Sequence, residues 1–125
     1  GGAAVWDMPA VSTKTGNVYF GTGQPLPFNG LINGPGAELG TDGVYALDAM
    51  TGKFKWFYQE VHHDIWDFDS MQTPLVTPVT MNGKQVEAIT HINKNAHYWV
   101  LDATTGKPAP IASWTAGTSP VPSGG

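Results

Sequence analysis

The sequence predicts an all-β fold, and three observations lead to this prediction. Charged residues make up only 13% of the 125 residues, whereas 16 Gly and 10 Pro together make up about a fifth. Short runs rich in Val, Ile, Thr, Tyr, Phe and Trp recur along the chain, with turn residues between them, as is typical of strands. No segment carries a convincing helical period of useful length.

Six strands are expected in chain order, each a β-rich run bounded by turn residues. A hairpin is expected between the fourth and fifth runs, because both residues of Asn82-Gly83 tolerate the positive φ angles of a two-residue turn. The six runs are Asn17–Thr22, Gly43–Leu47, Phe54–Val61, Pro74–Thr80, Gln85–Asn93 and Ala96–Leu101.

An internal repeat joins these strands into larger units. The segment from Leu47 to Lys53, LDAMTGK, matches LDATTGK from Leu101 to Lys107, and Thr13-Lys14-Thr15-Gly16 is a weaker copy. An Asp that accepts backbone amides, followed by Thr-Gly, forms a tight turn in which the Gly takes positive φ. Such a turn at regular intervals is what a radial or stacked β-repeat needs, although two similar hairpins are the simpler alternative. Trp56 follows the first copy and is expected to pack one repeat against the next.

The most informative segment runs from His63 to Asp69, with the sequence HDIWDFD. Three carboxylates within seven residues suit a hard cation or a proton-transfer site, while a surface turn with Asp side chains bonded to local amides is the plain alternative. His63, His91 and His97 lack a compact metal-ligand spacing. We expect the first two to be structural hydrogen-bonding residues and His97 to lie in a strand.

Composition excludes several classes of protein. A net charge of −4 with six basic residues argues against a nucleic-acid surface. No apolar run approaches the length of a membrane-spanning helix, and the first residues show no signal peptide. The absence of Cys rules out disulfides and thiolate metal sites within these residues, and it leaves the cellular compartment open.

Four segments, in order and at similar spacing, resemble the quinoprotein alcohol dehydrogenases, which use pyrroloquinoline quinone (PQQ). Ala46-x-Asp48-x-x-Thr51-Gly52-x-x-x-Trp56 resembles the tryptophan-docking motif of their eight-bladed propeller. The other three are Trp6-Asp7 with the following VYFGTGQP, the HDIWDFD segment, and HINKN leading into YWVLD. The resemblance implies a partial β-propeller of about two four-stranded antiparallel blades over residues 1–117, followed by a Pro/Gly/Ser-rich tail over 118–125.

The resemblance also implies roles for three residues. Trp6 matches the tryptophan that forms the floor under the quinone, where a flat indole stacks on a flat cofactor. Asp67 matches the catalytic aspartate, which contacts the metal and acts as general base for the alcohol proton while hydride passes to the quinone. Lys94 matches a basic residue that hydrogen-bonds the reactive carbonyl edge and stabilises charge on reduction. Ordinary core or surface roles are the alternatives for Trp6 and Lys94.

Two further residues concern the metal. Lanthanide-using relatives carry an additional Asp at the position of Asp69, and an extended segment would put Asp67 and Asp69 on one face, so that both bind one ion. Calcium and a lanthanide both remain open. Gln24 stands where the family supplies an Asn to the metal, and its extra methylene requires the ion or the loop to shift.

The implied activity is PQQ- and metal-dependent oxidation of a primary alcohol to an aldehyde, with a cytochrome c-type electron acceptor and a periplasmic location. A non-catalytic PQQ-like propeller scaffold and a quinoprotein sugar or polymer-alcohol dehydrogenase are the alternatives. The resemblance covers about two of eight blades, so the chain is expected to need the remaining blades and to be inactive alone.

Overall fold

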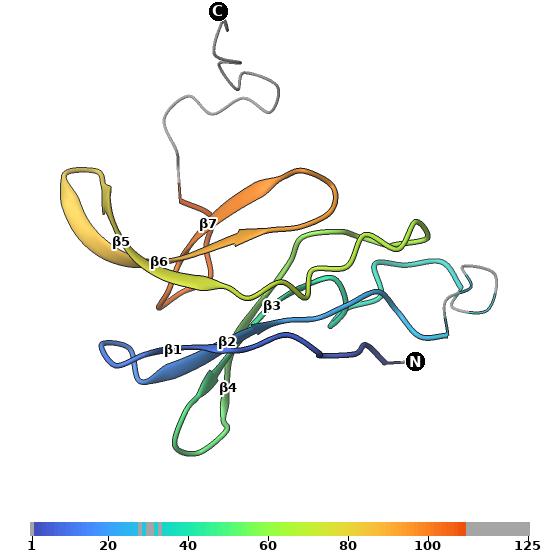
Figure 1. Cartoon of the computed structure of the whole chain (residues 1–125), viewed down its shortest axis with the longest axis horizontal. Coiled ribbons are helices and arrows are strands. Elements are labelled where there is room, and N and C mark those ends of the chain that lie inside the picture. The colour runs from blue at the N-terminus through green and yellow to red at the C-terminus, as the bar shows by residue number, and fades with distance from the viewer. Residues whose placement is uncertain (1, 28, 30–31, 33, 110–125) are drawn as a thin grey trace, which may run out of the picture.

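The computed structural model describes residues 2–27, 29, 32 and 34–109, and its strands form two antiparallel sheets (Figure 1). The first sheet has the order β1-β2-β3-β4 and the second the order β5-β6-β7. This confirms the all-β prediction. The strands are β1 (Ala10–Ser12), β2 (Asn17–Gly21), β3 (Gly43–Asp48), β4 (Phe54–Gln59), β5 (Leu75–Met81), β6 (Lys84–Ile92) and β7 (Tyr98–Asp102).

The two sheets share one hydrophobic core. Alternate residues of β2 and β3 face inward, as the period of two in a strand requires, and they meet side chains of β6 and β7. Every strand pair is between neighbours in the sequence, so the chain builds one sheet and then the next. The buried cluster consists of Tyr19, Val44, Ala46, Trp56, Ile89, Leu101 and Ala103.

Most strand predictions agree with the structure to within two residues. The hairpin at Asn82-Gly83 is confirmed, with φ angles of 50° and 76°. β1 was not predicted, because three residues are too short to show a period. β4 ends at Gln59 because the next two amides turn away and donate to the Asp42 main-chain oxygen.

The expectation that His97 lies in a strand is wrong by one residue. β7 begins at Tyr98, and the His97 amide donates to Asn95 Oδ1 at 2.9 Å. That turn also places Ala96 at a φ of 64°. The hydrogen bond keeps His97 in the turn, where its ring stacks on Trp99 with centroids 5.6 Å apart.

The repeated turns have the predicted chemistry. Asp48 Oδ1 accepts from the Met50 and Thr51 amides at 3.0 and 2.9 Å, and Gly52 has a φ of 71°. Asp102 makes the same two bonds to the amides of residues 104 and 105, ahead of Gly106. The weaker copy is also a turn of this kind, in which Ser12 Oγ takes the place of the Asp oxygen.

Trp56 packs the first sheet against the second, as predicted. Its indole Nε1 donates to the Ala103 main-chain oxygen at 3.1 Å, and its ring lies over Gly106, where a Cβ would come within 2.5 Å of it. Tyr19 Oη donates to the same oxygen at 2.9 Å. The turn of one sheet is thus the docking surface for the tryptophan of its neighbour.

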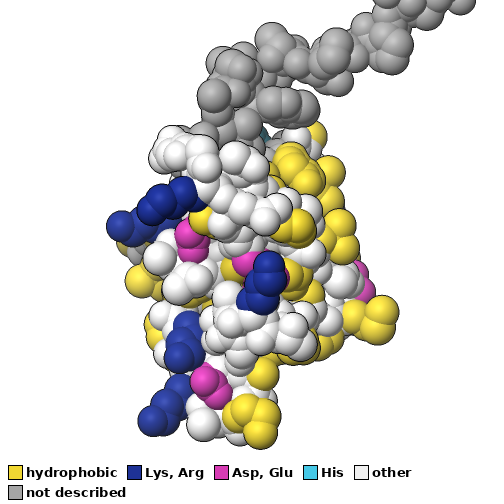
Figure 2. All heavy atoms as spheres, turned by 90° about the vertical axis from the view of Figure 1, so that its left-hand side faces the viewer, with side chains coloured by type: hydrophobic (Ala, Val, Ile, Leu, Met, Phe, Trp, Pro, Cys, Tyr) yellow, Lys and Arg dark blue, Asp and Glu magenta, His cyan; other side chains and the backbone are white. Residues whose placement is uncertain are grey.

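The long connections gather on one side of the molecule. In Figure 1 the β2–β3 and β4–β5 connections and the β6–β7 turn all extend to the right, away from the β5–β6 hairpin. The side with the β5–β6 hairpin faces the viewer in Figure 2 and carries separate Lys side chains with Asp or Glu side chains close to them. Loops on one side of a rigid scaffold are where functional side chains are commonly held.

Two further expectations concern a membrane-spanning helix and the C-terminal tail. In the described part of the chain, no helix has the length and apolar character to cross a membrane. The expected boundary at residue 118 lies outside the described residues, as does any fourth strand of the second sheet beyond residue 109.

Candidate functional site

The HDIWDFD segment is a loop organised by one buried carboxylate. Asp64 is 1% exposed and accepts hydrogen bonds from the amides of Trp66, Phe68 and Asp69 at 2.8, 2.7 and 3.4 Å. Asp64 therefore has the plain structural role that the sequence left open for these acids. Its bonds curl the segment, so that Asp67 and Asp69 take φ angles of 64° and 54°. The expectation of an extended segment with both acids on one face is wrong for this reason.

Lys94, from the β6–β7 turn, nevertheless brings the two acids together. Its Nζ lies 2.7 Å from Asp69 Oδ2 and 3.8 Å from Asp67 Oδ2, and it donates to the Asp67 main-chain oxygen at 3.0 Å. The Asp69 side chain is 5% exposed, whereas that of Asp67 is 50% exposed. The hydrogen bond to Asp69, with the nearby charge of Asp67, raises the pKa of Lys94 above its usual value. Lys94 is therefore a fixed cation beside an accessible carboxylate.

Trp6 reaches this site from the N-terminal segment. A Cβ built at Gly23 would lie 2.5 Å from the Trp6 ring and 2.8 Å from Asp69 Oδ1, so only glycine allows both groups to approach this backbone. The Gly23 amide donates to the Ala4 main-chain oxygen at 2.9 Å, which pairs the two segments. The indole is half exposed, so part of its surface is available to a ligand.

Gln24 meets the site through its backbone. Its amide donates to Asp69 Oδ1 at 2.9 Å, while Lys94 occupies Oδ2, so both oxygens of Asp69 accept from N–H groups. Within the described ranges, no group of three or more His, Cys, Asp or Glu side chains is arranged to hold a metal ion. A metal at Asp67 and Asp69 needs further ligands and a displaced ammonium group.

A buried polar network lies behind these residues, and sequence reasoning missed most of it. Glu60 bonds to His91 and Asn93 with distances of 2.7 and 3.2 Å. His91 is thus a structural hydrogen-bonding residue, as predicted. His63 also fits that prediction, since its Nδ1 lies 2.8 Å from the Gly36 main-chain oxygen.

Asp42, which the sequence analysis also missed, is a buried acid beside this loop. It is fully buried, and neither carboxyl oxygen has a hydrogen-bond partner among the described residues. Burial, followed by the nearby charge of Asp64, raises the pKa of Asp42 to about 8. The carboxyl group is therefore largely neutral at pH 7.

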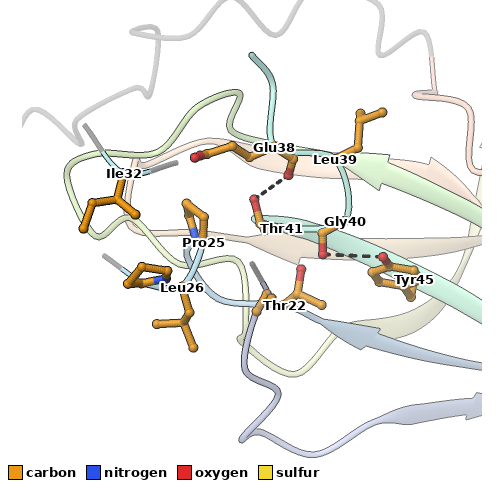
Figure 3. Close-up of a pocket in the computed structure, with 12 residues that line it drawn as sticks. Thr22, Pro25, Leu26, Ile32, Glu38, Leu39, Gly40, Thr41 and Tyr45 are labelled. Carbon is orange, nitrogen blue, oxygen red and sulfur yellow. Dashed lines mark hydrogen bonds between the residues drawn. The ribbon is translucent and has the colours of Figure 1, made fainter. Parts of the chain in front are cut away.

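A second pocket, with a volume of about 700 Å³, is lined by Thr22, by Pro25 to Pro27 and by the segment from Glu38 to Thr41 (Figure 3). Pro25, Leu26 and Leu39 contribute apolar walls, and Glu38 lines it as well. Trp6, Asp67 and Lys94 are not among its lining residues. We place the candidate site at the charged cluster, since that cluster holds the groups able to move a proton or orient a ligand.

The fold and the site together define a class of protein. Two antiparallel sheets packed through a docking tryptophan are neighbouring blades of a β-propeller, with an indole, an ammonium group and carboxylates gathered in the loops at one end. The family model for the PQQ class, described as glucose/ethanol/alcohol dehydrogenase, beta-propeller domain, matches residues 1–124. The chain belongs to this family.

Characterised relatives agree with this assignment. The chain is 37% identical over 109 residues to a quinohemoprotein alcohol dehydrogenase of Comamonas testosteroni and 31% identical over 120 residues to a lanthanide-dependent methanol dehydrogenase of Methylorubrum extorquens. These matches cover 86% and 91% of the chain, but the chain spans only 15% and 20% of the length of the two relatives.

Solved structures give the same fold. The crystal structure of the Comamonas testosteroni quinohemoprotein alcohol dehydrogenase superimposes with a TM-score of 0.80 at 36% identity, over 86% of this chain and 16% of that one. A europium-containing methanol dehydrogenase superimposes with a TM-score of 0.82 at 28% identity, over 86% of this chain and 19% of that one. The predicted partial propeller is thereby confirmed.

Proposed function

We propose that this chain supplies part of the active site of a PQQ- and metal-dependent dehydrogenase that oxidises a primary alcohol to an aldehyde. The observation that carries the proposal is the meeting of Lys94 with Asp69 and Asp67, at 2.7 and 3.8 Å, next to the glycine on which Trp6 rests. These groups come from four segments of the chain, and their family relatives are dehydrogenases. A scaffold has no need for this combination.

The residues fit a flat, anionic quinone. Gly23 leaves the backbone open against the Trp6 ring, so the exposed indole face can stack on the cofactor. Lys94 has three N–H donors, of which two go to Asp69 Oδ2 and the Asp67 main-chain oxygen, so one remains for a quinone oxygen. Bound PQQ supplies the electron-accepting group for the reaction.

Asp67 is proposed as the general base. Its carboxylate is half exposed at the mouth of the site, so it is able to accept the hydroxyl proton of a bound alcohol. The main-chain bond between Lys94 and Asp67 fixes this carboxylate relative to the cation.

A metal ion is also proposed, with Asp67 and Asp69 as ligands after the Lys94 ammonium group has moved away from Asp69, and with further oxygen ligands from outside the described residues. Carboxylates suit hard cations such as calcium or a lanthanide. One relative is named as lanthanide-dependent and one solved neighbour contains europium, which supports a metal of this kind without choosing the ion. We assign Gln24 only its backbone bond to Asp69.

The relatives are much longer than this chain, which indicates that further blades complete the propeller. Because the chain spans 15% to 20% of them, we propose that it works with the remaining blades of a longer propeller and is inactive alone. A cytochrome c-type acceptor and a periplasmic location are proposed on the same family basis. Expression of residues 1–125 by themselves, with PQQ and metal added, is expected to give no alcohol oxidation.

The proposal is tested with Asp67→Asn in the complete gene product that carries this chain. Loss of the base is expected to lower kcat about 100- to 10,000-fold, while PQQ binding, followed by quenching of Trp fluorescence, is retained. Asp48→Asn is the matched control, because an amide oxygen still accepts the two turn amides at this distant site. Full activity of Asp67→Asn would exclude this base, and absence of PQQ binding by the wild type would favour the scaffold alternative. Faster turnover of a sugar or polymer alcohol than of a primary alcohol would favour the third alternative.

A further inference from the structure

Glu60 lies at the centre of a buried network behind the site. It follows β4 directly, and its side chain is 0% exposed. Its Oε1 lies 2.7 Å from His91 Nδ1, and its Oε2 accepts from Asn93 Nδ2 at 3.2 Å. Asn93 Nδ2 also donates to Ser70 Oγ at 3.0 Å. Glu60 therefore bonds directly to β6 and to the β6–β7 turn, and Asn93 links it to Ser70, the residue after the HDIWDFD loop.

The protons of the His91 ring follow from its partners. Nε2 lies 2.8 Å from the Gln72 main-chain oxygen, which only accepts, so Nε2 carries a proton. Nδ1 faces Glu60, and one proton lies between these two atoms, on the ring or on the carboxyl group. Both ring nitrogens are thus used, and the His91 side chain is 0% exposed. Loss of either member leaves a buried polar group without its partner.

The network includes the residues immediately next to Lys94 and Asp69 in the chain. Asn93 precedes Lys94, and Ser70 follows Asp69. The Asn93 side chain bonds to Ser70 on one side and to Glu60 on the other, and Asn93 Oδ1 accepts from the Asn95 amide at 2.9 Å. The Ser70 amide donates to the Thr22 main-chain oxygen at 3.1 Å. The two backbone segments that carry Lys94 and Asp69 therefore have a fixed spacing.

We propose that Glu60 and His91 are positioning residues, which set the contact of Lys94 with Asp69 and Asp67 through Asn93 and Ser70. The contact itself is made by a half-exposed lysine, and such surface ion pairs contribute little on their own because both side chains lose freedom. A buried hydrogen-bonded network on the adjacent residues supplies the rigidity that the ion pair lacks. The catalytic meaning of this geometry rests on the proposed function, but the geometry is tested without it.

The first test uses Glu60→Leu in the complete gene product. Leucine has a similar volume but no polar side-chain atom, so His91 Nδ1 and Asn93 Nδ2 both lose their Glu60 partner. We expect the rate of Lys94 acylation by an N-hydroxysuccinimide acetate reagent, read by mass spectrometry relative to Lys84, to rise about fivefold or more, in line with a coupling of roughly 1 kcal/mol. Lys84 lies in the β5–β6 hairpin and serves as the internal reference.

Tyr19→Phe is the matched control variant. It removes a buried hydrogen bond of 2.9 Å to the Ala103 main-chain oxygen, far from Lys94 in the fold. Its Lys94 labelling is expected to equal that of the wild type. Equal labelling of Lys94 in folded Glu60→Leu and wild type, or an equal rise in Tyr19→Phe, would overturn the positioning role. Asn93→Ser is the milder second variant if Glu60→Leu does not fold, with a smaller rise expected, and an unchanged rate there also counts against the proposal.

Turnover separates this inference from the proposed function. Glu60→Leu is expected to lower kcat for alcohol oxidation with little change in KM, whereas Tyr19→Phe leaves both unchanged. If the wild type has no PQQ-dependent activity, the proposed function fails while the labelling result still decides the positioning role. If the wild type is active and labelling is unchanged in Glu60→Leu, the positioning role alone is lost.

Discussion

The Trp56 ring of the first sheet lies over Gly106 of the second, with no room for a Cβ between them. The same ring donates its N–H to the Ala103 main-chain oxygen at 3.1 Å. The repeat that the sequence shows twice therefore works across the sheet boundary: the turn of the second copy receives the tryptophan that follows the first.

Gly106→Ala is expected to destabilise the protein more than Gly52→Ala. Both glycines have a φ of 71°, so both substitutions carry the same backbone strain, but only the Cβ at position 106 would meet another group, at 2.5 Å from Trp56. The difference in unfolding free energy is expected to be about 1–3 kcal/mol, the usual cost of overpacking. Urea denaturation of the two variants measures it. Equal midpoints would show that the glycine serves only the turn.

Gly23→Ala is expected to weaken PQQ binding about tenfold or more. The added methyl group would overlap the Trp6 ring and Asp69 Oδ1, at 2.5 and 2.8 Å, so the indole must leave its place. Titration of the apoprotein with PQQ, followed by Trp fluorescence, gives the affinity. Gly2→Ala is the control, because nothing lies within 4 Å of a Cβ there. An unchanged affinity in Gly23→Ala would remove Trp6 from the cofactor site.

Asp69→Ala is expected to lower lanthanide-supported activity about tenfold or more relative to calcium-supported activity. Each unit of ion charge near a carboxylate is worth on the order of a few kcal/mol at a partly buried site, so the trivalent ion loses more. The substitution also frees Lys94 from its 2.7 Å contact, but this affects both ions alike. Activity of the metal-free enzyme reloaded with La³⁺ or Ca²⁺ gives the ratio. Equal losses would refute Asp69 as the residue that selects the ion.

Asp42→Asn is expected to stabilise the protein at pH 8 and to have little effect at pH 4. Burial raises the pKa of Asp42 from 3.8 to about 8, so the folded state holds a proton that the unfolded state releases above pH 4. The contribution of Asp42 to the stability of the wild type is therefore fully present below pH 4 and is lost as the pH rises toward 8. A neutral amide avoids this loss, and we expect a gain of about 1–3 kcal/mol at pH 8.

Thermal melts of wild type and Asp42→Asn across this pH range measure the difference. Asp7→Asn is the control of opposite sign, because hydrogen bonds from the Met8 amide and the Thr73 side chain lower the pKa of that exposed carboxyl group. Its removal is expected to cost stability at neutral pH and not at low pH. A parallel pH profile for wild type and Asp42→Asn would show that Asp42 is charged in the folded protein.

Residue patterns along the chain were enough for the strands and turns. Alternation and β-rich composition gave six of the seven described strands, and the Asp-x-x-Thr-Gly pattern gave two turns with the same hydrogen bonds. Strand alternation and turn hydrogen bonds both depend on residues that are close in sequence, so both can be predicted from the sequence alone. β1 escaped because its three residues are ordered by pairing with β2 and not by a pattern of their own.

The candidate site was predicted only in part from the sequence. Motifs and their spacing identified four candidate residues, Trp6, Asp67, Asp69 and Lys94. The reason given for pairing the two acids, an extended segment, was wrong. Asp64 curls the loop, and Lys94, 25 residues beyond Asp69, joins the acids from another turn. The roles of Gly23, Asp42 and Glu60 depend on neighbours far away in the chain, and no local pattern marks them.

By itself the sequence determined the all-β class, the repeated turn and the residue types of the site, because these depend on local backbone preference and side-chain chemistry. Only the tertiary structure decided which acid is buried, which is exposed, and that Glu60 links the β6–β7 turn, which carries Lys94, to the residue after the HDIWDFD loop. Burial and hydrogen-bond partners are properties of packed neighbours, and packing brings together residues that the linear order keeps apart.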